Sequence, residues 1–305
     1  MPNKLLTTIY PAIKPFWLLA MDISNKRKSK ALRKDLAPVF DKYRETEAGL
    51  PEAPAIPKAV WSMWYSEDNL PSLSRLCLKR MKDSLSPLGY EVNILSKDTI
   101  QDYVDMSDIL PYLEDGKIAI QFYSDVLRTR LLKEYGGFWL DATMAVLDPE
   151  ELERMRESVP FISFRTTLRP YTANITKGLY NIYFLGTFKG NPLFQFLDEA
   201  LSACLAKNDG NTEYFLWNYL VRAGYECLPF VKEEIDSISA YYPEAVNQLM
   251  LRQVFEKPFD AEAYERIVKE APLQKLNNKD YGKDGPLRAA QGKETFYGHL
   301  SAIWE

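Results

Sequence analysis

The residues whose types and spacing could do chemistry fall in one short stretch, SDVLRTRLLKEYGGFWLDAT, at residues 124–143. Asp125 and Arg128 lie three residues apart, so a helix would place both on one face. Asp141 ends an apolar run that is typical of a buried strand, and Thr143 points to the same side if the extended chain continues. Ligands of open α/β sheets bind beyond the carboxyl ends of strands, so Asp141 marks a candidate site.

From their types alone, these residues leave two interpretations open. An Asp-x-x-Arg pair is most often a local surface ion pair, although here its helix runs directly into the strand that ends at Asp141. A buried acid is either a hydrogen-bonded part of the structure or a ligand for a hard cation. Carboxylate oxygens suit Mg²⁺ or Mn²⁺, and the Thr143 hydroxyl can bind such an ion weakly or hold one of its waters.

Several other chemistries lack the residues that they need. The sequence has neither a GxGxxG motif after a strand nor a GxxxxGK[ST] motif, so it signals neither a dinucleotide site nor a P-loop. His299 is the one histidine, which excludes HExxH and leaves a catalytic triad a single candidate base. Cys77, Cys204 and Cys227 are widely spaced, so we expect free thiols in a reducing compartment.

Composition bounds the class of protein. The chain has 305 residues, 46% of them hydrophobic, which is enough for one large domain or two small ones. The net charge of −4 provides no general basic surface, so we expect no nucleic-acid partner.

The N-terminal segment differs from the rest of the chain. Residues 9–21, IYPAIKPFWLLAM, are apolar but interrupted by prolines and a lysine, and they are too short to span a bilayer. They also lack the start and the cleavage site of a signal peptide. With the basic run KRKSKALRK at 26–34, the segment fits either a helix packed on the domain or contact with an anionic membrane. We expect a cytoplasmic protein, and membrane contact would place it peripherally on the inner face of the plasma membrane.

Organisation along the chain predicts an α/β fold. A proline cluster near residue 54 separates a helical segment, residues 1–50, from a domain at 51–305. The hydrophobic patterns predict strands at 58–64, 90–95, 138–140, 160–164 and 182–188, and helices at 70–85, 97–104, 124–135, 192–205, 213–222, 245–255 and 261–269. Ser124 is the predicted N-cap of the helix that Gly136 ends, and the last forty residues are predicted as loops. The alternation favours a sheet with helices on its faces.

Two tryptophans follow the proline cluster, Trp61 and Trp64 in VWSMWY. Inside a strand they would be core residues, as tryptophans usually are. At the end of a strand, one of them could stack on a nucleobase.

Three blocks together resemble the glycosyltransferases of the capsular polysaccharide synthesis type, a branch of the DXD-sugar transferases. The blocks are IPKAVWSMW at 56–64, SDVLR at 124–128 and GGFWLDAT at 136–143, in the order and spacing of that family. The similarity covers residues 56–205 well, and YGHLSAIWE at 297–305 is similar to the family's terminal segment.

The resemblance implies a GT-A fold, a Rossmann-like mixed sheet flanked by helices that binds a UDP-sugar and Mn²⁺ or Mg²⁺. By position, Trp64 matches the aromatic residue that stacks on uracil. Asp125 and Arg128 match the pair that holds the ribose, the donor sugar and its phosphates. Asp141 matches the first acid of the DXD motif, and Thr143 stands where a second acid normally binds the metal, so we expect weaker metal binding.

The terminal segment adds candidates by the same resemblance. In relatives it closes over the diphosphate as a lid and can supply a metal ligand. His299 is therefore a candidate ligand that could compensate for Thr143, although a lone C-terminal histidine can equally be a solvated tail residue. Ser301 and Trp304 are candidates for closing the donor site.

The resemblance therefore predicts a metal-dependent, retaining hexosyltransferase that extends a polysaccharide or a lipid-linked oligosaccharide, as in capsule or exopolysaccharide synthesis. Asp125, Arg128 and Asp141 would carry the catalysis, and Asn181 is a further candidate beneath the donor sugar. Two alternatives differ in class. A hydrolase of the same sugars would need two opposed carboxylates. A lapsed transferase would bind nucleotide-sugar or a membrane partner without turnover.

Overall fold

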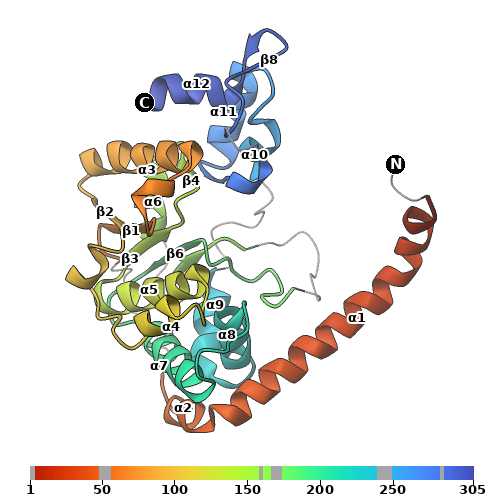
Figure 1. The fold of residues 1–305 in the computed structure, drawn as a ribbon, viewed down its shortest axis with the longest axis vertical. Helices are drawn as coiled ribbons and strands as arrows, with labels where there is room; N and C mark the ends of the chain where they lie inside the picture. Colours follow the sequence, from red (N-terminus) through yellow and green to blue (C-terminus); the bar gives the residue numbers. More distant parts are fainter. Residues whose placement is uncertain (1–3, 48–55, 158–160, 166–173, 239–248, 282–284) are drawn as a thin grey trace.

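A five-stranded mixed sheet forms the centre of the protein, with helices on both of its faces (Figure 1). The computed structural model describes residues 4–47, 56–157, 161–165, 174–238, 249–281 and 285–305. The strand order is β2-β1-β3-β6-β5, made of β1 (Ala59–Met63), β2 (Glu91–Leu95), β3 (Gly137–Leu140), β5 (Phe161–Ser163) and β6 (Phe184–Thr187). This arrangement confirms the mixed α/β sheet that the sequence predicts.

The directions of the strands bring three segments to one edge of the sheet. Strand β1 is parallel to both β2 and β3, so β1 and β3 end at the same edge. Strand β6 is antiparallel to β3 and pairs Phe184 with Leu140, so the residues before β6 lie at that edge too. The backbone N–H of Asp141 donates to the carbonyl of Tyr183 at 3.0 Å and closes this corner.

The alternation of side chains along the strands divides the core into two layers. Trp61, Trp139 and Leu185 pack on one face against α5 (Ile120–Tyr135), α7 (Pro192–Lys207), α8 (Leu216–Cys227) and α9 (Pro229–Ser237). Val60 and Phe138 pack on the other face against α3 (Ser72–Leu85) and α6 (Glu150–Arg156). Every residue of β3 is buried, which explains why this strand is almost entirely apolar.

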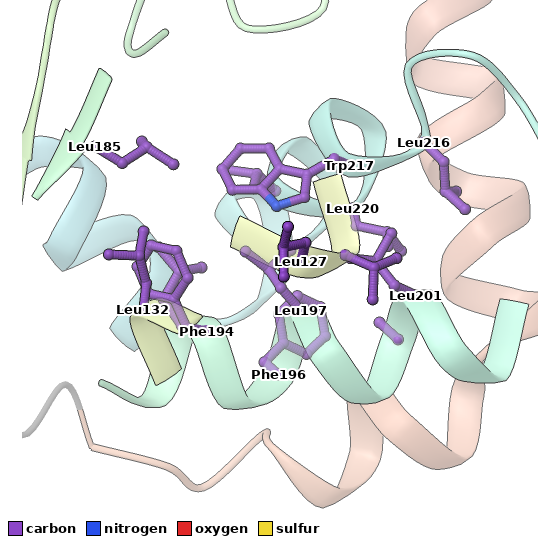
Figure 2. Packing of buried hydrophobic residues seen from close by; sticks show 14 of the residues in the cluster. Leu127, Leu132, Leu185, Phe194, Phe196, Leu197, Leu201, Leu216, Trp217 and Leu220 are labelled. Carbon is purple, nitrogen blue, oxygen red and sulfur yellow. The ribbon is translucent and has the colours of Figure 1, made fainter. Parts of the chain in front are cut away.

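Trp217 anchors the helical layer that carries α5. Figure 2 shows its indole among Leu127 of α5 and Leu197 and Leu220 of the neighbouring helices. Its Nε1–H donates to the Thr129 hydroxyl of α5 at 2.9 Å, so the buried polar atom is satisfied. This packing holds α5 against the sheet.

Two glycines make the turn from α5 into β3. Gly136 and Gly137 have φ angles of 67° and 89°, which favour glycine. A Cβ on Gly137 would lie 2.4 Å from the Ala59 carbonyl oxygen of the neighbouring strand. Because the chain reverses in this tight turn, the N-terminal half of α5 lies beside the end of β3.

The C-terminal third adds a smaller layer against α3. It contains α10 (Met250–Val254), α11 (Ala261–Glu270), α12 (Phe296–Trp304), β7 (Leu273–Lys275) and the short hairpin β8 (Ala289–Ala290) and β9 (Lys293–Glu294). Strand β7 pairs antiparallel with β4 (Met144–Val146), which follows β3 in the chain. The prediction of loops for the last forty residues is therefore wrong. Their polar residues occupy turns and caps, such as Thr295 at the start of α12, and their apolar residues form a third core cluster.

The N-terminal segment forms one long helix, α1 (Lys4–Asp35), followed by α2 (Ala37–Lys42). The C-terminal half of α1 is tied to α8 by an ion pair between Asp22 and Arg222 at 2.9 Å and by a hydrogen bond from Tyr219 to Asn25. The N-terminal half projects from the body of the protein (Figure 1). Among the described residues, no helix combines the length and the apolar character needed to cross a bilayer.

Most predicted elements are confirmed, two local predictions are corrected, and one predicted helix lies partly outside the described residues. Residues 97–104 form only the 3₁₀ turn η3 (Ile100–Asp102), because Ser96 and Thr99 close it with side-chain hydrogen bonds. Helix α5 begins at Ile120, so Ser124 lies inside the helix and Ala119 is the N-cap. The helix predicted at 245–255 appears as α10, and its residues 245–248 lie outside the described part of the chain.

The remaining short elements connect these layers. They are α4 (Leu110–Glu114) and the 3₁₀ turns η1 (Glu67–Asn69), η2 (Ser86–Leu88) and η6 (Asn278–Asp280). The three cysteines are free, as predicted.

Candidate active site

A cavity of about 630 Å³ opens at the edge of the sheet where β1 and β3 end. Its walls come from the end of β1, the N-terminal half of α5, the end of β3 with the turn that follows it, and the residues just before β6. The volume lies within the usual range for small-molecule sites. Trp64, Asp125, Arg128, Asp141 and Thr143 all line it, so the structure brings together the residues that the three sequence blocks single out.

Asp125 and Arg128 form the wall of the cavity that α5 contributes. They share one helix face, as predicted, with Asp125 Oδ1 3.2 Å from Arg128 Nη1. Both side chains are more than nine-tenths buried, so this is not a surface ion pair. Burial raises the pKa of Asp125 to about 6, although Arg128 opposes that shift; the neighbouring Asp141 adds to it. The pair can therefore hold a polar ligand at a site with restricted access to water.

Arg128 is held in place by three further contacts. Nη1 donates to the Ile182 carbonyl at 2.9 Å, Nη2 lies 3.3 Å from the Ser124 hydroxyl, and the guanidinium stacks over the Trp139 ring at 5.0 Å. Its buried Nε has no hydrogen-bond partner among the residues that the structure describes. A fixed guanidinium in a cavity wall suits an anionic oxygen.

Asp141 stands between two cations. Its Oδ1 accepts from Trp139 Nε1 at 2.9 Å and lies 3.7 Å from Arg128 Nη2. Its Oδ2 accepts from the ammonium of Lys275 at 2.9 Å. Burial alone would raise the pKa of Asp141, but the charges of Lys275 and Arg128 hold it below its usual value. The carboxylate is therefore ionised, and both of its oxygens are engaged.

Lys275 reaches this point from a distant part of the chain. It is the last residue of β7 and pairs with Met144 in β4, while the Leu276 N–H donates to the Thr143 carbonyl at 3.0 Å. Its Nζ donates to the Thr143 hydroxyl at 2.8 Å as well as to Asp141. We call Thr143 and Lys275 the β4–β7 half of the site, and Trp64, Asp125, Arg128 and Asp141 the sheet-edge half.

The oxygen ligands available at this point do not fit a divalent cation in this arrangement. Two of the three expected ligands, Asp141 and Thr143, both accept hydrogen bonds from the Lys275 ammonium. A divalent cation on the same carboxylate would lie next to that positive charge and be repelled by it. The described residues also contain no cluster of three or more acidic, histidine or cysteine side chains suited to a metal ion.

The two tryptophans of VWSMWY have different environments. Trp61 is buried in the sheet, where its Nε1–H donates to the Gly136 carbonyl at 2.9 Å. Trp64 follows the end of β1, lines the cavity and donates to the side chain of Asn69 at 3.0 Å. Trp61 is thus the core residue, and Trp64 is the one placed to meet a ligand.

The structure does not bring the terminal residues to this cavity. His299 Nδ1 lies 3.2 Å from Glu294 Oε2, and its ring stacks on Phe259 at 3.7 Å. The Ser301 hydroxyl donates to the Tyr297 carbonyl within α12, and Trp304 is buried in the third core cluster. None of the three is among the described residues that line the cavity. In this structure α12 is a packing element of the C-terminal layer.

Asn181 is also engaged elsewhere. Its side-chain amide donates to the Phe164 carbonyl at 3.1 Å, and its backbone N–H donates to the Ser163 hydroxyl at 2.8 Å. These bonds give it a structural role in the loop before β6.

Two features of the site, Lys275 and the pair Tyr214 and Phe215, lie outside the three sequence blocks and were not predicted. Lys275 lies in a segment without a recognisable motif, and only the pairing of β7 with β4 brings it to Asp141. Tyr214 and Phe215 line the cavity although both are about half exposed, and their rings meet edge to face at 4.7 Å. In the sequence, only the adjacent aromatic residues of EYFLW at 213–217 could have indicated that Tyr214 and Phe215 line a site. Because aromatic pairs of this kind are common in protein cores, the pattern does not distinguish a site from the core.

Comparisons with known proteins extend these observations. A family model described as capsular polysaccharide synthesis protein matches residues 16–300. The O-glycosyltransferase braB of Annulohypoxylon truncatum is 25% identical over 266 residues, which cover 81% of this chain. The chain spans 60% of the length of that relative. Among solved structures, the PaToxG glycosyltransferase gives a TM-score of 0.39 at 15% identity, covering 80% of this chain and 95% of that one.

Proposed function

The chain belongs to the family of capsular polysaccharide synthesis proteins, and on that premise we propose that it is a glycosyltransferase. It moves a hexose from a UDP-sugar to a growing polysaccharide or a lipid-linked oligosaccharide. The observation that carries the proposal is the cavity that joins Trp64 of the first sequence block to Asp125 and Arg128 of the second. The relative from Annulohypoxylon truncatum, an O-glycosyltransferase, supports the same class of reaction.

Three residues of the sheet-edge half have roles in this reaction. Trp64 stacks on the uracil of the donor. Asp125 accepts hydrogen bonds from sugar or ribose hydroxyls and fixes their orientation. Arg128 neutralises the charge that develops on the leaving diphosphate, which is the main electrostatic task of the site.

The reaction retains the configuration at the anomeric carbon. The bond from C1 of the sugar to the diphosphate oxygen breaks, and its electron pair remains on that oxygen. The acceptor oxygen bonds to C1 from the same face, and its proton passes to the departing phosphate oxygen. This route needs no separate protein base, which agrees with the engagement of Asp125 by Arg128 and of Asp141 by Lys275.

The acceptor enters past the aromatic pair. Tyr214 and Phe215 line the cavity and remain half exposed, as expected of a platform for a sugar ring or a lipid chain. Glu213 next to them pairs with Lys28 of α1 at 2.7 Å, so this side of the cavity adjoins the long helix.

Helix α1 supports contact with an anionic membrane surface. Phe16, Trp17 and Leu19 are exposed on its projecting half, and the exposed lysines and arginine of the basic run follow. We expect Phe16→Ser/Trp17→Ser to weaken cosedimentation with vesicles that contain phosphatidylserine. The matched control is Leu287→Ser, an equally exposed apolar residue elsewhere. Equal binding of the double variant and the natural protein would contradict the membrane contact.

A donor screen tests the proposed function. We expect UDP to raise the melting temperature, and one member of a panel that includes UDP-glucose, UDP-galactose and UDP-N-acetylglucosamine to release UDP when an acceptor is present. The assays are run both with Mn²⁺ and with EDTA. Free hexose as the product would indicate a hydrolase, and binding without turnover would indicate a lapsed transferase. Failure of every nucleotide to bind would overturn the proposal.

A further inference from the structure

We propose that Lys275 takes the place of the divalent cation, so that this protein binds and activates the donor diphosphate without a metal. The inference rests on the proposed function and deepens it. The ammonium of Lys275 donates hydrogen bonds to Asp141 at 2.9 Å and to Thr143 at 2.8 Å, which are two of the three positions where the resemblance predicts metal ligands.

The position of Lys275 is fixed by the backbone. Strand β7 pairs with β4 along its whole length, and the ladder continues through the bond from Leu276 N–H to the Thr143 carbonyl. The side chain is largely buried, and its ammonium lies 5.1 Å from the ring centre of Tyr183, which lines the cavity. The ladder fixes the backbone of Lys275, and the bonds to Asp141 and Thr143 fix its ammonium. The ammonium is therefore positioned before any ligand binds, unlike that of a flexible surface lysine.

The charges also account for Thr143. Two acids of a DXD motif carry two negative charges and balance one divalent cation. Here a single carboxylate, Asp141, balances the single charge of Lys275, and the neutral hydroxyl of Thr143 accepts one of the ammonium's hydrogen bonds. A second acid at position 143 would leave the pair with an excess negative charge, which would repel a diphosphate. Thr143 in place of the second acid and Lys275 in place of the cation thus belong together, because each keeps the charge of the site balanced when the other is present.

Two cations then converge on the expected position of the diphosphate. Arg128 lines the cavity and contacts Asp141 from α5; Lys275 is not itself among the described lining residues, and it reaches the cavity wall from β7 through Asp141 and Thr143, which are. When the bond from C1 to the diphosphate breaks, the electron pair remains on the phosphate oxygen. Lys275 and Arg128 stabilise that charge, and the acceptor's proton is transferred to the same oxygen. The ammonium gives up no proton, so the step is balanced without a metal.

The test compares nucleotide binding in EDTA with binding in Mn²⁺, using UDP and inorganic pyrophosphate as probes. We expect the natural protein to bind UDP with the same affinity in both, within about threefold. Lys275→Met keeps the aliphatic stem against Tyr183 and should raise the dissociation constant for UDP in EDTA by about 10- to 100-fold, as for the loss of a charged hydrogen-bond donor. Lys275→Arg should restore part of the affinity. The matched control, Lys279→Ala, removes an exposed lysine four residues away and should change nothing.

The outcomes separate this inference from the proposed function. If UDP binds in Mn²⁺ but more than tenfold more weakly in EDTA, a metal is needed; the inference is then overturned and the glycosyltransferase stands. UDP binding that is unchanged in Lys275→Met, with the variant's melting temperature within a few degrees of the natural protein's, also overturns it. If neither UDP nor pyrophosphate binds under either condition, the proposed function fails and the inference fails with it. Donor turnover in EDTA that is lost in Lys275→Met and partly regained in Lys275→Arg supports both.

Discussion

The two halves of the site are built by different routes along the chain. The sheet-edge half comes from residues 64–141 and depends on short connections, above all the glycine turn between α5 and β3. The β4–β7 half joins Thr143 to Lys275, 132 residues later, through a two-stranded ladder. All residues of the first half lie in recognisable motifs, whereas in the second half Thr143 does and Lys275 does not. With the roles proposed above, a motif marks where a ligand binds while a residue that sets its chemistry lies outside every motif.

The largest expected effect concerns the turn that builds the sheet-edge half. Gly137→Ala places a Cβ 2.4 Å from the Ala59 carbonyl oxygen at a φ of 89°, so the backbone must shift. We expect a loss of at least about 3 kcal/mol in the free energy of unfolding, measured by urea denaturation. Gly116→Ala is the matched control, because Gly116 has a φ of 68° but open space around it. A loss of only about 1 kcal/mol in both variants would show that the turn tolerates a side chain.

The second prediction converts one half of the site into a metal site. Thr143→Asp combined with Lys275→Ala removes the ammonium and restores two carboxylates two residues apart. We expect UDP binding by this double variant to become about 10- to 100-fold tighter in Mn²⁺ than in EDTA, a range typical of changes around a metal. Isothermal titration measures the ratio. Thr143→Asp alone keeps Lys275, so its UDP binding should not depend on Mn²⁺. If UDP binding by this single variant did become dependent on Mn²⁺, Lys275 would not be what keeps a metal from the β4–β7 half.

The third prediction compares the two tryptophans of the first block. Trp64→Ala should weaken UDP binding by about 1–3 kcal/mol through lost stacking, and leave the fold intact because Trp64 lies at the end of its strand. Trp61→Phe removes the buried hydrogen bond to Gly136 and should lower the unfolding free energy instead. Fluorescence titration and thermal unfolding of both variants separate the two roles. An unchanged affinity in Trp64→Ala would assign that tryptophan to packing.

The smallest expected effect concerns a buried acid outside both halves. Glu234 of α9 accepts from Asn191 at 2.7 Å, and burial raises its pKa to about 8 from an ordinary value of 4.5. A raised folded-state pKa means that its contribution is complete below about pH 4.5 and is lost as the pH rises through about 8. Glu234→Gln should therefore lessen the decline of stability between about pH 4.5 and pH 8, whose slope reaches up to about 1.4 kcal/mol per pH unit. The exposed neighbour serves as control: the charge of Glu233 adds only a minor part of the Glu234 shift, so Glu233→Gln should change the pH profile far less than Glu234→Gln does.

The sequence predicts the sheet-edge half well because its physics is local. Helical spacing places Asp125 beside Arg128, a glycine turn returns the helix to the sheet, and the apolar strand delivers Asp141 to the edge. The C-terminal layer is harder to predict, because its strands are two or three residues long and its turns are polar. No periodicity develops over such lengths, so the pairing of β7 with β4 depends on tertiary contacts.

The prediction that His299 lies beside Asp141 as a metal ligand also depends on tertiary packing that the sequence does not show. Its position in a motif-like segment indicates chemistry, whereas the structure shows the ring stacked on Phe259 within the C-terminal layer. Local sequence reports which residue types are available, but the packing of α12 against α3 decides where they point.

The pairing of β4 with β7 also affects how the protein acquires activity during synthesis. Chains grow from the N-terminus, and the sheet-edge residues leave the ribosome more than a hundred residues before Lys275 does. The sheet-edge residues are therefore synthesised while the chain still lacks the ammonium beside Asp141. If Lys275 holds the diphosphate as proposed, a product that ends before residue 275 would lack the charge that the reaction needs.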